Sequence, residues 1–269
     1  MNYLVMDRRE AVLQAASVFC PDPSYQVIGR TALRNNIRIR EAILPEVRII
    51  EEQAFCSCTT LRNVEFGQLT VVKKEAFSGC TQLREIAFPA TLKRLERAAF
   101  SGCIRMKEVS FTDRCGCGEL PEQIFSGCCQ LERVELPFGL RVIGDRGFYG
   151  CEALAVIDFP DTLRKIGRGA FSRSGLQKLL LPQGLLTISE EAFMKCRSLE
   201  YVRIPESVRK IGRWAFHGCS RMKVLEIHHD PQEIGEWITN KSCIIRCPRG
   251  SRMEKYAGEY GMKAELLDA

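Results

Sequence analysis

Residues 154–171 read Leu-Ala-Val-Ile-Asp-Phe-Pro-Asp-Thr-Leu-Arg-Lys-Ile-Gly-Arg-Gly-Ala-Phe, and variants of this stretch recur along most of the chain. Aligned on the final large apolar residue, the chain contains nine units spaced 22 to 25 residues apart. The aligned residues are Leu33, Phe55, Phe77, Phe100, Phe125, Phe148, Phe171, Phe193 and Phe216. About 23 residues cannot enclose a core alone, so the period predicts stacked coils that bury apolar columns against one another.

Each unit has further fixed positions. An aliphatic residue lies five positions before the aligned one, as Ile166 lies before Phe171, and another apolar residue lies three positions earlier. After the aligned residue comes a pattern such as Leu61, Val64 and Phe66, which predicts one strand of a parallel sheet per coil. The second apolar segment predicts a strand or an extended run. The Ala-Phe-Ser-Gly-Cys string, present at 76–80, predicts a tight turn or a short 3₁₀ helix.

The ends of the repeat array carry helix signals. Asp7 and Glu10 have capping-box spacing, which predicts an N-terminal cap over 1–24 with a helix at about 7–19. The repeats then occupy 25–229. Ser251 is placed to cap a second helix at about 252–260, so 230–269 forms a C-terminal cap, in which 262–267 adds an edge strand. An insertion at 114–118 is expected to bulge from the stack.

The repeat unit resembles the BspA-like (Treponema-type) leucine-rich repeats, whose positions are matched best by Leu154, Ile157, Phe159-Pro160, Leu163 and Ile166-Gly167 with Ala170-Phe171. The resemblance covers about three quarters of the chain. It implies an α/β-type repeat solenoid, with a parallel sheet, short turns or 3₁₀ helices, and helical end caps. It also implies an interaction protein, since characterised relatives are bacterial surface proteins that take part in adhesion. No catalytic residues belong to this repeat class.

Composition sets broad limits on function. The 269 residues are 45% hydrophobic and 27% charged, which excludes a disordered chain. No apolar run reaches the roughly 18 residues of a membrane span, and the formal charge of +6 does not itself call for nucleic acid. No export signal is visible near Met1, which favours the cytoplasm; a surface or secreted location is the alternative if the chain is trimmed from a longer one.

Cysteine is the most frequent candidate for chemistry, with 14 residues. Seven occupy one repeat position and predict a buried ladder of free thiols: Cys58, Cys80, Cys103, Cys128, Cys151, Cys196 and Cys219. Cys115 and Cys117, near Cys128-Cys129, suggest a metal site, but their one-residue spacing is poor for zinc. Whether Cys115 and Cys117, or Cys243 and Cys247, form a disulfide or bind metal is left open.

Catalytic motifs are missing from the sequence. The three histidines, His217, His228 and His229, have no triad context, and there is no Gly-x-Ser-x-Gly elbow or phosphate-binding loop. The sequence therefore predicts a protein without enzymatic activity or cofactor.

Outward-facing residues are the remaining candidates for a binding site. A row on the first strand is mildly acidic, and a basic stripe follows the second segment, without the aromatic interleaving typical of nucleic-acid binding. We expect a protein partner, bound by Arg62, Glu65, Glu85, Glu135, Asp158, Tyr201, Arg203 and Trp214. The alternatives are a structural spacer without a ligand of its own and, more weakly, a metal or redox protein that uses the surplus cysteines.

Overall fold

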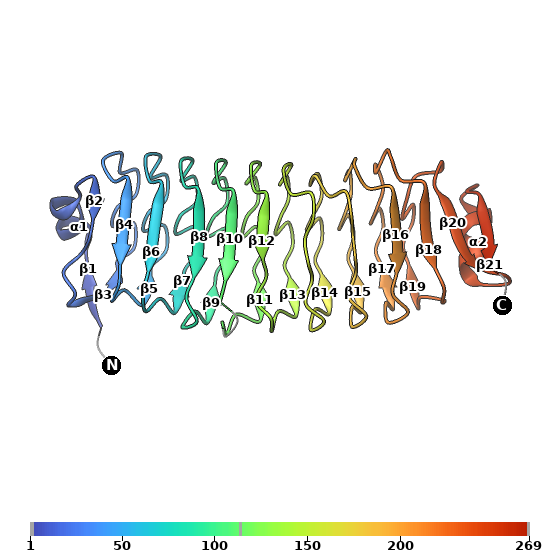
Figure 1. Ribbon diagram of the computed structural model, residues 1–269, viewed down its shortest axis with the longest axis horizontal. Helices are drawn as coiled ribbons and strands as arrows, with labels where there is room; N and C mark the ends of the chain where they lie inside the picture. The colour runs from blue at the N-terminus through green and yellow to red at the C-terminus, as the bar shows by residue number, and fades with distance from the viewer. Residues whose placement is uncertain (1–2, 113–114, 268–269) are drawn as a thin grey trace.

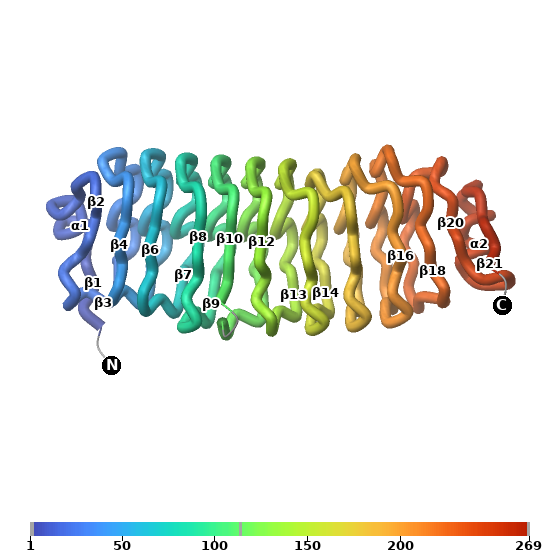
Figure 2. Tube along the Cα trace, viewed as in Figure 1, coloured from blue at the N-terminus to red at the C-terminus, as the bar shows by residue number. Residues whose placement is uncertain are grey.

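The computed structural model describes residues 3–112 and 115–267, which form one rod (Figure 1). The chain winds from one end of the rod to the other, so the two termini lie at opposite ends (Figure 2). Each regular coil contributes a strand to a first row, a short strand to a second row, and a turn segment that forms the remaining side, here called the turn side.

The first row carries the longer strands, β2 and β4 to β12 in even numbers, then β16, β18, β20 and β21. Their bounds are Val18–Phe19, Glu41–Leu44, Asn63–Phe66, Glu85–Phe88, Glu108–Phe111, Arg133–Glu135, Tyr201–Ile204, Val224–Ile227, Ile244–Pro248 and Ala264–Leu267. All strand pairs in the row are parallel. Alternate residues face the interior, as the buried–exposed alternation of β8 and β16 shows.

The second row comprises β1, β3, β5, β7, β9, β11, β13, β14, β15, β17 and β19, again in parallel. Their bounds are Leu4–Met6, Tyr25–Ile28, Ile49–Ile50, Val71–Val72, Arg94–Leu95, Glu119–Leu120, Val142–Ile143, Lys165–Ile166, Thr187–Ile188, Lys210–Ile211 and Glu233–Ile234. These eleven strands within the described residues correct the expected nine coils to about eleven. The two additional coils, at β1 and β19, lack the Phe on which the sequence repeats align.

A column of stacked phenylalanines fills the centre of the rod. Neighbouring rings from Phe55 to Phe216 have centroids 4.9 to 5.8 Å apart and are nearly parallel, with interplanar angles of 5 to 27°. The widest spacing joins Phe100 to Phe125, the pair separated by the insertion in the sequence. Arg114 of the predicted insertion lies outside the described residues. The predicted alignment of successive coils is therefore confirmed.

The predicted cysteine ladder runs beside this column. All seven ladder cysteines are buried, and each thiol donates to a main-chain carbonyl of the preceding coil, as Cys80 does to Phe55 at 3.1 Å. Burial raises the pKa of the Cys103 thiol to about 12. A small apolar side chain with one weak donor suits this position, which explains the frequency of cysteine without any redox role.

The turn side is a series of turns, which settles the choice between a turn and a 3₁₀ helix. Two positions per coil, two residues before and two after the aligned Phe, adopt left-handed backbone conformations, as Glu75 (φ 56°) and Gly79 (φ 73°) do around Phe77. This alternation turns amides towards the next coil, where Phe77 donates to Ala99 at 2.8 Å. The turn side therefore has a backbone ladder of its own.

Helices lie at the two ends. α1 covers Arg8–Gln14 behind the predicted capping box of Asp7 and Glu10. It stops short of the expected residue 19, because Val18–Phe19 already forms β2 and pairs with β4. α2 covers Arg252–Glu259, with Ser251 as its N-cap, and β21 follows as the last strand. No helix in the described part of the chain is long and apolar enough to cross a membrane.

Candidate functional site

The outward face of the first row brings together most of the residues expected to bind a partner. Glu65, Glu85, Glu135, Tyr201 and Arg203 are exposed side chains on its strands. Arg62 and Asp158 lie in the same rows of exposed residues, outside the strands themselves.

Trp214 is placed elsewhere. It lies on the turn side, three residues after the end of β17, with a left-handed backbone (φ 58°) and the Arg213 guanidinium 4.3 Å from its ring centroid. The predicted set therefore divides into a face of seven residues and one separate tryptophan.

The first row is interrupted near its middle. Among the described residues it has no strand between the end of β12 at Glu135 and the start of β16 at Tyr201, although the coils continue there as plain trace in Figure 1. The adjacent turn side is also one residue shorter than usual, and Gly175 approaches so closely that a Cβ there would lie 2.0 Å from the Glu152 carbonyl oxygen. The interior stays closed, since Ile157, Leu179 and Leu181 are buried.

A groove of about 850 Å³ lies at this interruption. Its apolar lining comes from Leu179, Leu180, Leu181, Tyr201, Ile204 and Pro205, and its polar lining includes Lys178, Glu200, Arg203, Glu206, Arg221 and His228. Leu180 is 80% exposed and Tyr201 46% exposed, whereas the neighbouring outward positions are mostly charged. A volume of this size suits a ligand or a peptide segment.

A second hollow of about 420 Å³ adjoins the groove, and Ser198 lines both. We call it the basic hollow; its other lining residues are Glu152, Arg173, Ser174, Gly175, Lys195 and Arg197. The sequence indicated this site through two departures from the repeat, since Arg173 and Lys195 replace the Gly of the Phe-x-Gly-Cys string. Neither residue was among those expected to bind a partner, because the repeat pattern does not show that this position has a left-handed backbone.

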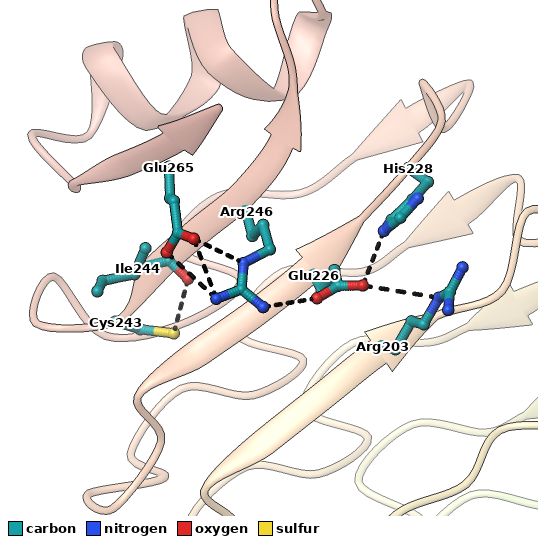
Figure 3. A network of polar contacts seen from close by, with 7 residues as sticks. All are labelled: Arg203, Glu226, His228, Cys243, Ile244, Arg246 and Glu265. Carbon is teal, nitrogen blue, oxygen red and sulfur yellow. Dashed lines mark hydrogen bonds and ion pairs between the residues drawn. The ribbon is translucent and has the colours of Figure 1, made fainter. Parts of the chain in front are cut away.

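A charged network borders the groove at β18. Glu226 accepts from Arg246 at 2.9 Å, lies 2.7 Å from the His228 ring and 3.7 Å from Arg203, and Arg246 also pairs with Glu265 (Figure 3). Burial opposes the charge of Glu226, but the hydrogen bonds from Arg246 and His228 outweigh it and lower its pKa. This network holds Arg203 and His228 at the groove edge.

The remaining chemical candidates are dispersed. Within the described ranges, no three histidine, cysteine or acidic side chains gather as metal ligands. His228 contacts Glu226, whereas His229 contacts the Val208 carbonyl. Cys115 and Cys117 are close, and a hydrogen bond from Cys117 lowers the pKa of Cys115 to about 7.

Comparison with known proteins agrees with the architecture. The sequence profile of the BspA type leucine rich repeat region matches residues 18–117 and 118–245 with six copies. No curated protein matches the chain.

Solved structures of bacterial proteins share the fold. A leucine-rich repeat protein from Bacteroides ovatus is 20% identical, with 93% of this chain and 92% of that one covered and a TM-score of 0.51. A leucine rich cell surface protein from Faecalibacterium prausnitzii is 20% identical, with 91% and 84% covered and a TM-score of 0.55. At these identities the likeness shows the fold alone.

Proposed function

The chain belongs to the BspA-type leucine-rich repeat family, and from this premise we propose that it binds a protein partner, without catalysis, through the outward face of the first row. The single observation that carries the proposal is the groove at the interrupted part of that row. Exposed Leu180 and Tyr201 there adjoin charged side chains, a mixture typical of protein-binding surfaces.

Rigid coils favour binding by such a face. The exposed residues stand on a backbone fixed by stacking, so little conformational entropy is lost when a partner binds. Arg62, Glu65, Glu85, Glu135 and Asp158 lie along the same face and extend the proposed contact beyond the groove. Trp214 is proposed only as a peripheral contact, since the Arg213 guanidinium lies over its ring.

The test compares captured proteins across three baits. The intact chain and a second-row control, Lys165→Ser with Arg209→Ser, should retain the same partner from a bacterial or host lysate. Leu180→Ser with Tyr201→Ser should lose it, by about tenfold or more. All four positions are exposed, so neither variant is expected to disturb folding. Equal retention of the partner by all three baits would contradict this site, and capture of no partner by the intact chain would favour the spacer scaffold.

A further inference from the structure

Arg173 and Lys195 occupy a position that five of the other seven aligned coils give to glycine. Two residues after the aligned Phe the backbone is left-handed, and five coils place Gly79, Gly102, Gly127, Gly150 and Gly218 there. Arg173 (φ 60°) and Lys195 (φ 61°) adopt the same conformation in neighbouring coils, at a cost of about 1 kcal/mol or more for each side chain. Among the coils without glycine at this position, Asn35 and Ser57 are uncharged, whereas Arg173 and Lys195 place two basic side chains in adjacent coils.

The basic hollow offers these charges to a ligand. Arg173, Lys195 and Arg197 line it together with one carboxylate, that of Glu152. Within the described part of the chain, none of the three cations has a carboxylate within ion-pair distance, although Arg168, Arg213 and Lys223 in nearby coils all do. Arg173 instead lies 5.9 Å from the centre of the Tyr149 ring. Three cations against one carboxylate leave the hollow with an excess of positive charge, which favours an anionic group.

The groove next to the basic hollow suits an apolar group of a ligand. Its floor is apolar, and Leu180 projects from it with 80% of its surface exposed. Lys178 and Arg221 at its rim also lack a carboxylate partner among the described residues. Since Ser198 lines both spaces, one ligand can place an acidic group in the basic hollow and an apolar group in the groove.

We propose that the two spaces together bind a short segment of a protein partner that carries Asp or Glu beside an aliphatic or aromatic residue. This inference rests on the proposed function and names the chemistry of its partner. A sulfated glycan or a nucleic acid fits less well, because neither supplies an apolar side chain for the groove. Of the described residues that line either space, Tyr201 and His228 alone carry an aromatic ring, so a row of stacking platforms for bases is missing there.

The test is selection of displayed random peptides on the intact chain, followed by affinity measurements on the enriched peptides by fluorescence anisotropy. We expect enrichment of acidic residues next to Leu, Phe or Tyr. Arg173→Gly with Lys195→Gly, which introduces the residue that five other coils carry at this position, should weaken binding by about tenfold or more, as should Leu180→Ser. The control, Arg48→Gln with Arg141→Gln, removes the same charge from the second-row stripe and should change affinity by less than about twofold.

The outcomes separate the two proposals. Enriched peptides that depend on Leu180 but are not acidic, and that bind the glycine double variant unchanged, would overturn this inference and leave the proposed function standing. Heparin or poly(U) that displaces the peptides and binds tightly irrespective of Leu180→Ser would make the hollow a general polyanion site and would also overturn it. Failure of any peptide to depend on the face would overturn both.

Discussion

Two parts of the first row differ in their strand pairing and outward residues, although the same phenylalanine column fills the interior behind both. From β8 to β12 the strands pair in register, and the outward residues are mostly charged or small. From residue 136 to residue 200 the first row has no strand, although the second row continues there through β13, β14 and β15, and the outward residues include exposed Val156 and Leu180. The phenylalanine column passes through both parts without a break. Stacking of side chains therefore maintains the solenoid, and the first row can lose its strands locally, at the proposed binding surface.

The largest expected effect on stability comes from removing one phenylalanine ring of the column in each part. Phe77→Ala and Phe171→Ala should each lower the free energy of unfolding by about 3–5 kcal/mol, because both rings are fully buried and stacked on two neighbours. Urea denaturation followed by circular dichroism measures both. A loss below about 1 kcal/mol for Phe171→Ala alone would mean that the core of the open part is loosely packed.

Amide hydrogen exchange compares the backbone hydrogen bonding of the two parts directly. Amides of 178–181 make no backbone hydrogen bond in the described structure, whereas Ile86 and Val109 lie in a paired ladder. We expect exchange at 178–181 to be faster on the order of a hundredfold, measured by mass spectrometry of overlapping peptides. Similar protection in both segments would show that the ladder closes in solution and that the groove is narrower there.

Sequence patterns predicted the interior well. The period, the phenylalanine column and the cysteine ladder follow from residues that recur in register, and each recurrence reports the same buried environment. The end coils were missed because their aligned position carries no large apolar residue: it is Ala11 in the first, and in the last it is Thr239, two residues after the left-handed Trp237. Sequence reasoning finds coils by their core residues, so a coil with a different core residue escapes it.

The candidate site was predicted less completely for a physical reason. Alternation along a strand shows which residues face outward, so Glu85, Tyr201 and Arg203 could be placed on one face. Opening of the ladder depends on how neighbouring coils approach one another, and no single coil encodes that distance. The glycine departures at Arg173 and Lys195 were visible in the sequence, but their meaning needed the left-handed backbone that the structure supplies.

The charged network at β18 predicts a pH dependence for the edge of the groove. The pKa of Glu226 is below its ordinary value of 4.5, so its contribution to stability is present above that pH and is lost as the pH falls through the lower, folded-state pKa. Glu226→Gln should lower the free energy of unfolding by about 1–2 kcal/mol at pH 7 and flatten its decline below about pH 4.5. Parallel urea titrations of the two proteins at pH 3 to 7 would show the difference; curves that stay the same distance apart would contradict it.

The smallest expected change in stability is for substitutions at the left-handed position two residues after the aligned Phe, where Arg173 and Lys195 line the basic hollow. Gly102→Arg should lower the free energy of unfolding by about 1 kcal/mol, because a Cβ there meets only ordinary contacts of 3.8 Å and the cost is conformational. Arg173→Gly should change it by less than about 1 kcal/mol, since release of strain is offset by a more flexible unfolded chain. Thermal unfolding of both variants measures this asymmetry. A loss of 2 kcal/mol or more for Arg173→Gly would mean that the arginine supports the fold through Tyr149, and its strained conformation would then be explained without a partner.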